Sequence, residues 1–208
     1  MILAVIQARM SSNRLPGKVL LPIAGKPMLQ HVIDATEKSA LVDHAIVATS
    51  EEASDDPICK YLEERYNQSP GHGYYRGSLD DVLGRFYQTA SGAYLHPTYI
   101  VRLTADCPLL TGDIIDATIK AHLEGNNHYT VNEVDGVDVE VFSYDTLLRA
   151  HKLATSKFDR EHVTPWIKAR CIPNVIHCGV DVGSVDTRQE YEMIKDFIEA
   201  REGVRNGN

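Results

Sequence analysis

Three cationic side chains lie close together near the amino terminus, in a stretch without acids. Arg9, Arg14 and Lys18 occur in Gln-Ala-Arg-Met-Ser-Ser-Asn-Arg-Leu-Pro-Gly-Lys, residues 7–18, directly after the apolar run 1–6. Arginine presents a planar fork to phosphate oxygens, and lysine presents a point charge. Since the apolar run is typical of a buried strand, the sequence predicts a strand that ends in a loop suited to a polyphosphate.

Charge is unevenly distributed along the chain. The first acid is Asp34, although the whole chain has 21 Lys or Arg, 29 Asp or Glu and a net charge of −8. A loop at the carboxyl end of a parallel strand is where open α/β sheets bind ligands, and a local positive field attracts anions. Gly17 and the small Ser11 and Ser12 let backbone N–H groups take part. The alternative is a solvated loop whose cations point outward or pair with carboxylates from elsewhere, which would remove the support for this site.

Asp106 is the first candidate for binding a metal ion beside such an anion. It follows the apolar stretch 99–103, at the carboxyl end of a predicted strand, where side chains point into the ligand crevice. Mg²⁺ commonly takes one or two carboxylates together with phosphate oxygens. The structural alternative is a turn before Pro108 that the aspartate caps.

Overall composition limits the class of protein. At 208 residues and 43% hydrophobic content, the chain suits one globular domain. The negative net charge, with no basic patch beyond the first loop, argues against a nucleic-acid or membrane partner. The four cysteines include no Cys-x-x-Cys pair, and no apolar run approaches the ~20 residues that span a bilayer. We therefore expect a cytoplasmic protein with reduced thiols.

Strand and helix patterns alternate, which predicts an α/β fold with an open, mostly parallel sheet and helices on both faces. The expected strands are 1–6, 45–49, 99–103 and 174–180. The expected helices are 27–39, 55–66, 79–93, 112–124, 144–155, 159–169 and 187–201.

Residues 128–143 depart from this alternation. Their pattern indicates two strands around the Asp135-Gly136 turn. We expect this hairpin to add antiparallel pairing to a mixed sheet and to project as a lid or dimer arm. The whole would form a single domain, 1–202, followed by a frayed tail, 203–208.

The segment 7–18 resembles the signature of sugar-acid cytidylyltransferases, in particular the spore coat polysaccharide biosynthesis protein F branch, which is related to acylneuraminate and 3-deoxy-manno-octulosonate cytidylyltransferases. Further matching segments follow in consistent order: Gly25-Lys-Pro-Met28, Arg76-Gly-Ser-Leu-Asp-Asp-Val82, Arg102-Leu-Thr-Ala-Asp-Cys-Pro108, Arg160-Glu-His-Val-Thr164 and Val185-Asp-Thr187. The resemblance implies a three-layer nucleotide-diphospho-sugar transferase (Rossmann-like) fold. It also implies a Mg²⁺-dependent enzyme, homodimeric by analogy, that condenses CTP with a sugar, giving a CMP-sugar and pyrophosphate.

The resemblance also assigns roles to individual residues. Arg9, Arg14 and Lys18 would neutralise charge on the α-phosphate and the leaving pyrophosphate, and with Asp106 they would be the catalytic residues. Asp106 and Asp186 would bind the metal. The nucleotide-binding residues would be Gln7, Ala8, Arg9, Met10, Ser11, Arg14, Lys18, Ser78, Thr104 and Ala105. These roles agree with phosphoryl transfer in general, because there a protein supplies mostly positioning and electrostatics.

Two of these implied roles have structural alternatives. Asp186 could instead be the N-cap of the last helix; the family commonly continues Asp-Thr-Pro-Glu-Asp there, whereas this chain has Asp186-Thr-Arg-Gln-Glu190. Ser78-Leu-Asp-Asp81 is an S-x-x-D capping box for a helix at 79. Beside that role, the resemblance implies a cytosine contact for Ser78 and a substrate contact for Asp80 or Asp81.

Three further residues are candidates for binding the sugar. Glu161 and His162 lie in a segment that matches a family motif, and the alternative for His162 is a local hydrogen bond within a helix. Asn132 would contact the sugar or stabilise the hairpin turn through its amide. No residue stands out as a dedicated base, and a metal-bound hydroxyl needs less help because the metal lowers its pKa.

The sequence leaves two other functions open. A glycosyltransferase of the same fold would use a finished nucleotide-sugar, but such enzymes usually carry a D-x-D metal pair after a strand, which Asp106-Cys-Pro108 lacks. A non-catalytic nucleotide-binding subunit of a polysaccharide assembly complex would bind CTP without turnover.

Overall fold

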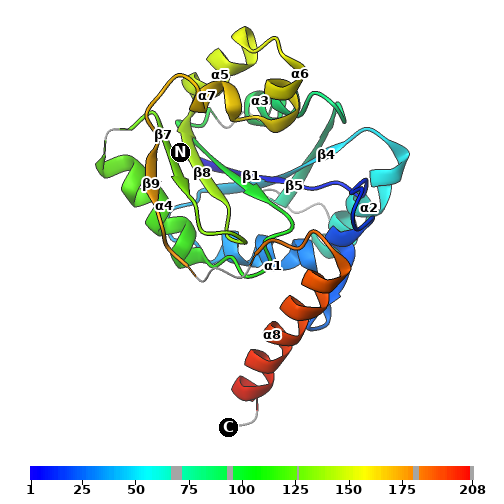
Figure 1. Cartoon of the computed structure of the whole chain (residues 1–208). Helices are drawn as coiled ribbons and strands as arrows, with labels where there is room; N and C mark the ends of the chain where they lie inside the picture. Colours follow the sequence, from blue (N-terminus) through cyan, green and yellow to red (C-terminus); the bar gives the residue numbers. More distant parts are fainter. Residues whose placement is uncertain (67–71, 93–95, 126, 180–182, 207–208) are drawn as a thin grey trace.

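In the computed structural model, which describes residues 1–66, 72–92, 96–125, 127–179 and 183–206, a seven-stranded sheet forms the centre of the molecule (Figure 1). From one edge to the other, its strands are β5 (His72–Gly77), β4 (His44–Ser50), β1 (Ile2–Gln7), β6 (Tyr99–Thr104), β8 (Val139–Ser143), β7 (Tyr129–Asn132) and β9 (Asn174–Ile176). Within this sheet only β8 runs antiparallel to its neighbours. The predicted mixed, mostly parallel sheet is therefore confirmed.

Helices cover both faces of the sheet, so the molecule has three layers (Figure 1). One face carries α1 (Met28–Glu37), α2 (Asp56–Tyr66) and α4 (Gly112–Glu124), and the other carries α3 (Val82–Gly92), α5 (Tyr144–Leu153), α6 (Lys157–His162) and α7 (Pro165–Lys168). Successive residues of a strand point to opposite faces. Ala4 and Ile6 of β1 therefore belong to the first core, and Leu3 and Val5 to the second.

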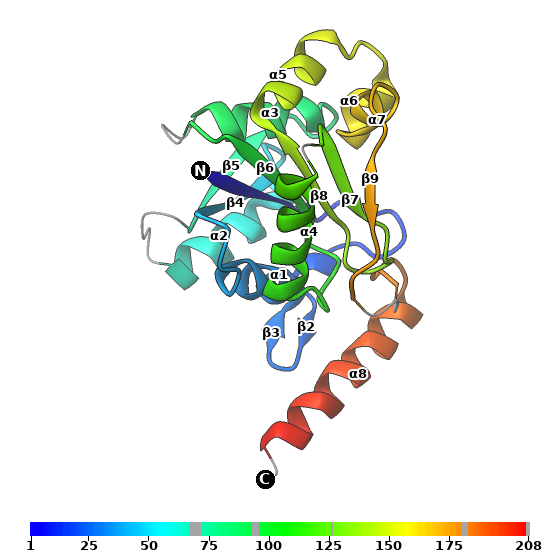
Figure 2. The same ribbon diagram turned by 90° about the vertical axis from the view of Figure 1, so that its left-hand side faces the viewer.

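The last helix, α8 (Arg188–Asn206), extends away from the body of the molecule (Figure 2). Its first turns pack on a small hairpin of β2 (Pro22–Ile23) and β3 (Lys26–Pro27). Tyr191 of the helix and Ile23 of the hairpin belong to a third apolar cluster. The helix continues to residue 206, past its expected end at 201. Residues 203–206 are thus helical rather than a frayed tail, and 207–208 lie outside the described residues.

The hairpin predicted at 128–143 exists, but its strands do not project. β7 and β8 pair with each other inside the sheet, with β6 on one side and β9 on the other. The expectation of a lid or dimer arm built from these strands is wrong. The physical reason is that they carry apolar residues on both faces: Val139 and Val141 belong to one core, Tyr129 and Phe142 to the other.

Other boundaries differ in ways that local chemistry explains. The patterns do not predict β5, because this edge strand is polar and contains two glycines. The helix expected at 159–169 is two helices, since Val163 adopts a φ of 69° and interrupts it. The strand expected at 174–180 ends at Ile176, and residue 180 lies outside the described residues. Within the described part of the chain, no helix combines the length and apolar content needed to cross a membrane.

Candidate active site

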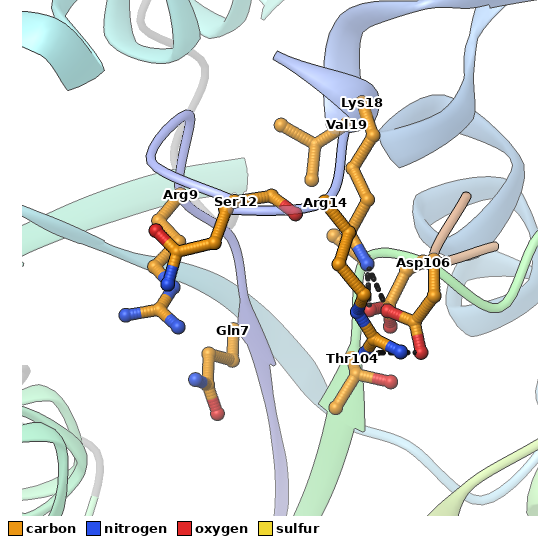
Figure 3. Close-up of a pocket in the computed structure, with 11 residues that line it drawn as sticks. Gln7, Arg9, Ser12, Arg14, Lys18, Val19, Thr104 and Asp106 are labelled. Carbon is orange, nitrogen blue, oxygen red and sulfur yellow. Dashed lines mark hydrogen bonds and ion pairs between the residues drawn. The ribbon is translucent and has the colours of Figure 1, made fainter. Parts of the chain in front are cut away.

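A cavity of about 270 Å³ opens at the carboxyl ends of β1 and β6, where the sequence predicts a ligand site. The parallel register pairs Gln7 with Thr104, which brings the two strand ends to the same level. Figure 3 shows Gln7 and Arg9 on one side of the cavity and Arg14 and Lys18 on the other. The lining residues are Gln7, Arg9, Ser12, Asn13, Arg14, Lys18, Val19, Thr104, Ala105, Asp106 and Asp186.

The cationic loop between β1 and the 3-10 helix η1 (Lys18–Leu20) has a defined path. Gly17 adopts a φ of 74°, which a side chain would disfavour, and its N–H donates to the Met10 carbonyl at 2.8 Å. The Met10 N–H in turn donates to Asp55 Oδ1 at 2.7 Å. Asp55 is buried and also accepts hydrogen bonds from Ser50 at the end of β4. The loop is therefore fixed to the sheet before any ligand binds.

Lys18 lies where the acidic side chains of the cavity meet. Its Nζ donates to Asp106 Oδ2 at 2.7 Å, to Asp186 Oδ1 at 2.9 Å and to the Val185 carbonyl at 2.7 Å. Burial alone would lower the pKa of Lys18, but the charges and hydrogen bonds of the two aspartates outweigh it and raise this pKa above its usual value. Lys18 is thus a buried cation that holds two carboxylates together.

Arg14 approaches the same acids from the solvent side. Its Nη2 lies 2.6 Å from Asp186 Oδ2, and 64% of the Arg14 side chain is exposed. Burial alone would raise the pKa of Asp186, but Lys18 and Arg14 lower it. Arg9, Arg14 and Lys18 all line one cavity. Arg14 and Lys18 are nevertheless paired with carboxylates, and these carboxylates belong to the cavity itself.

The start of α8 leaves the Asp186 carboxylate available to the cavity. Thr187 Oγ1 accepts from the Glu190 N–H at 3.3 Å, and Glu190 Oε2 accepts from the Thr187 N–H at 2.7 Å. This reciprocal capping box makes Thr187 the N-cap, so the alternative of Asp186 as cap is wrong. The Val185 N–H donates to the Asp106 carbonyl at 3.0 Å and joins the two aspartate segments.

Asp106 and Asp186 fit a divalent cation. Both carboxylates approach one cationic nitrogen within 2.9 Å, and carboxylate oxygens are the hard ligands that Mg²⁺ prefers. Across the described residues, no group of three or more His, Cys, Asp or Glu side chains could hold a metal ion. The protein would therefore contribute two carboxylates, and phosphate oxygens and water would have to complete the coordination shell.

Ser78 and Asp81 lie outside the cavity, at the start of α3. Ser78 Oγ accepts from the Asp81 N–H at 3.0 Å, and Asp81 Oδ1 accepts from the Gly84 N–H at 2.9 Å. The helix consequently begins at Val82 rather than at 79. Asp81 also forms an ion pair with Arg160. Asp81 therefore caps α3, Ser78 caps the turn that precedes it, and neither residue lines the cavity.

The candidates for sugar binding are also placed away from this cavity. Glu161 and His162 lie on α6, where the His162 ring contacts Phe158 at a centroid distance of 4.6 Å. The amide of Asn132 is engaged locally: Nδ2 donates to the Cys178 carbonyl at 2.7 Å, and Oδ1 accepts from the Cys178 N–H at 3.2 Å. Of the predicted nucleotide-binding residues, Ala8, Met10 and Ser11 shape the loop without lining the cavity.

There is a second cavity, of about 320 Å³, and a hydrogen bond links one of its lining residues to a lining residue of the first cavity. Arg102 Nη2 donates to Gln7 Oε1 at 3.3 Å, and Arg102 lines the second cavity while Gln7 lines the first. The lining residues are Arg102, Val131, Asn132, Glu133, Asp135, Asp138, Glu140 and Lys168. Sequence reasoning singled out only Asn132 among them. The available signal is an ionisable residue inside an apolar strand, Arg102 in β6 and Glu140 in β8.

The fold and the cavity define a class of protein: an open α/β sheet with cationic side chains and a pair of carboxylates around a cavity at the carboxyl edge of the sheet. The family profile described as cytidylyltransferase matches residues 3–202. The chain belongs to this cytidylyltransferase family.

The chain is similar to several known proteins. The chain is 31% identical to the spore coat polysaccharide biosynthesis protein SpsF of Bacillus subtilis, over 93% of this chain and 85% of that protein. It is 38% identical to protein MJ1063 of Methanocaldococcus jannaschii, over 80% of this chain and 66% of that protein. The match to the 3-deoxy-manno-octulosonate cytidylyltransferase of Trichlorobacter lovleyi is 36% identical but spans 59% of this chain and only 45% of that protein.

The solved structures show the same fold. A cytidylyltransferase from Leptospira borgpetersenii superposes with a TM-score of 0.84 at 27% identity, covering 96% of this chain and 87% of that one. The predicted three-layer nucleotidyltransferase fold is confirmed.

Proposed function

We propose that the protein transfers the cytidylyl group of CTP to a sugar acid, giving a CMP-sugar and pyrophosphate for the synthesis of a surface polysaccharide. An acceptor hydroxyl oxygen forms a bond to the α-phosphorus, and the bond from that phosphorus to its bridging oxygen breaks. Pyrophosphate leaves with the electron pair, and the hydroxyl proton passes to solvent. The observation that carries the proposal is the convergence of three loop cations and two aspartates on one cavity, in a chain of the cytidylyltransferase family.

The chain's own residues would divide the work by their position around the cavity. Arg14 and Lys18 lie on the side of the aspartates and would bind the triphosphate tail and stabilise the departing pyrophosphate. Gln7 and Arg9 form the opposite wall and would contact the nucleoside and the α-phosphate. Because hydrogen bonds already fix the backbone of the loop, its backbone would reorganise little on binding, which favours strong electrostatic stabilisation.

We propose Mg²⁺ as the metal, bound by Asp106 and Asp186. Bound there, it would neutralise phosphate charge and lower the pKa of the acceptor hydroxyl. The ammonium of Lys18 now occupies the space between these two carboxylates. It would therefore have to leave them when a metal binds, and its charge would then be available to the triphosphate.

A sugar acid as acceptor is supported by the relatives, one of which takes its name from spore coat polysaccharide synthesis and another from 3-deoxy-manno-octulosonate. The protein should be incubated with CTP, Mg²⁺ and a panel of sialic-, pseudaminic- and octulosonic-type acids, and pyrophosphate release should be followed. Release that depends on both CTP and one acid supports the proposal. Folded protein that releases no pyrophosphate with any nucleotide and any acid would contradict it, and tight CTP binding without turnover would instead indicate a nucleotide-binding subunit.

Two further properties belong to the proposal. Homodimerisation is suggested by the family, and sedimentation velocity of the purified chain at two concentrations would test it. A cytoplasmic location is supported by the four cysteines, all of which are free thiols in the described structure, and by the dependence on CTP. Fractionation of cells that express the tagged chain would test the location.

A further inference from the structure

Three adjacent strands carry polar side chains on a face of the sheet that is otherwise apolar. Residues two apart along a strand share a face. Gln7 of β1 is therefore on the side of Val5, and Glu140 of β8 is on the side of Phe142; both neighbours belong to the core beneath α3 and α5. The antiparallel register of β6 and β8 sets Arg102 opposite Glu140. A row of polar residues thus crosses β1, β6 and β8 on a core-forming face.

The carboxylate of Glu140 is the fixed end of this row. Its Oε2 accepts from Arg102 Nη1 at 2.7 Å, and its Oε1 lies 2.9 Å from Lys168 Nζ. The hydroxyls of Tyr129 and Thr164 donate to the same Oε1 at 2.5 and 3.0 Å. Burial alone would raise the pKa of Glu140, but Arg102 and Lys168 lower it to about 2. Glu140 is therefore an anion at neutral pH, and its contacts on both oxygens hold it in one place.

The guanidinium of Arg102 connects this anion to Gln7. While Nη1 binds Glu140, Nη2 donates to Gln7 Oε1 at 3.3 Å, and only 16% of the Arg102 side chain is exposed. Because the guanidinium is planar and rigid, a fixed Nη1 also sets the direction of Nη2. A buried ion pair commonly stabilises a fold no more than apolar residues of similar volume would. Its occurrence on a core-forming face therefore points to a role in orientation.

The contact with Arg102 decides which way the Gln7 amide faces. A guanidinium has donors only, so the amide atom that it contacts must be the oxygen. The amide nitrogen is then on the other side, and among the described residues no partner accepts its N–H groups. Gln7 lines the first cavity beside Arg9, and its amide nitrogen is turned to the side of Arg9 (Figure 3). This wall of the cavity thus presents hydrogen-bond donors to a ligand.

We propose that Arg102, held by Glu140, is a positioning residue that fixes the Gln7 amide with its N–H groups toward the first cavity, so that Gln7 donates to an oxygen of bound CTP. The inference rests on the proposed function, because it takes CTP as the ligand of that cavity. A donor that is oriented in advance does not have to reorganise when the ligand binds. Arg102 and Glu140 do not line the first cavity, so both act through Gln7.

The test is a double-mutant cycle on CTP affinity, measured by calorimetry in Mg²⁺ without an acceptor. Gln7→Leu removes the amide and is expected to weaken CTP binding by about 5-fold to 10-fold, the loss of one hydrogen bond. Arg102→Lys keeps a cation for Glu140 but lacks the planar fork, and should weaken binding by about 3-fold or more. The double variant should bind as Gln7→Leu does, because no amide remains to be oriented. A merely structural role for Arg102 would instead make the two losses multiply.

Two further variants support the cycle. Arg170→Lys is the matched control, since it makes the same substitution at an arginine that stacks over Trp166 at 4.2 Å and lines neither cavity. It should bind CTP like the wild type. Gln7→Glu keeps an acceptor for Arg102 but has no N–H group to donate, so it should bind CTP no better than Gln7→Leu. Because it leaves Arg102 in place, it carries the test if thermal melting shows that Arg102→Lys loses the fold.

The outcomes separate this inference from the proposed function. Losses that multiply in the double variant, or tighter CTP binding by Gln7→Glu than by Gln7→Leu, overturn the inference while cytidylyl transfer stands. Wild-type affinity in Gln7→Leu, or in folded Arg102→Lys, overturns it in the same way. Wild-type protein that neither binds CTP nor releases pyrophosphate overturns the inference and the proposed function together.

Discussion

Replacing Lys18 with methionine removes the ammonium that now joins the two proposed metal ligands. Nζ lies within 2.9 Å of both Asp106 and Asp186, and only 9% of the Lys18 side chain is exposed. Methionine fills nearly the same volume without a charge, so the loop and η1 should keep their positions. The variant therefore leaves the two carboxylates facing each other without the ammonium between them, and Arg14 remains paired with Asp186 alone.

The size of the effect follows from the geometry. Two carboxylates that both contact one nitrogen lie no more than about 6 Å apart, and at an effective dielectric constant near 20 they repel each other by about 3 kcal/mol. A divalent cation would relieve this repulsion and would no longer compete with the ammonium. Because about 1.4 kcal/mol corresponds to a tenfold change in affinity, metal binding without nucleotide should tighten by between 10-fold and 100-fold. Turnover should nevertheless fall by about 10²-fold or more, since the triphosphate loses a buried cation.

Titration calorimetry of Mg²⁺ and Mn²⁺ into nucleotide-free protein measures the first effect, and pyrophosphate release measures the second. Lys26→Met is the matched control, because it also removes a lysine paired with an aspartate, Asp34, but away from the cavity. Metal affinity that is unchanged or weaker in Lys18→Met, with Lys26→Met like the wild type, would refute the idea that the ammonium and the metal compete for one site.

Three further outcomes are expected. Arg14→Ala should lower kcat by about 10²-fold while weakening ground-state CTP binding much less, because its charge acts mainly as pyrophosphate departs; an equal loss in both would contradict that role. Glu140→Gln should lose about 3 kcal/mol of stability at neutral pH, because a carboxyl with a pKa near 2 instead of 4.5 stabilises the fold above pH 4.5 and loses this contribution as the pH falls toward 2. Urea unfolding at pH 7 and pH 3 should therefore show a smaller acid-induced loss for the variant than for the wild type. Gly17→Ala should cost about 1–2 kcal/mol and lower Tm by roughly 2–8 °C, since alanine disfavours a φ of 74°; an unchanged Tm would argue against this loop conformation.

The sequence predicts the elements whose pattern depends on local chemistry. The apolar runs give β1, β4 and β6, and the loop after β1 gives the cationic wall of the cavity, because composition and position in a parallel sheet together determine where a ligand binds. One strand escapes this reasoning. β5 is an edge strand with a polar surface, and its place depends on pairing with β4 rather than on its own residues.

The role of a polar side chain is harder to predict, since it depends on which partners the fold brings near. Thr187 rather than Asp186 caps α8, because Thr187 forms reciprocal hydrogen bonds with Glu190. The spacing in the sequence alone would permit either residue to be the cap. The hairpin departs from the alternation of strands and helices in the sequence, but its strands lie inside the sheet. The network around Glu140 joins β6, β8, β7 and α7, so no single segment carries a signal for it.

The central claim is that the amino-terminal loop binds a triphosphate. The most direct measurement is the affinity of the wild-type protein for CTP compared with CMP, by calorimetry in Mg²⁺ at low and high salt. Binding at least 100-fold tighter for CTP, with a difference that shrinks as salt rises, is the result expected from a cationic cavity. Equal affinities at both salt concentrations would show that the loop does not bind the phosphate tail.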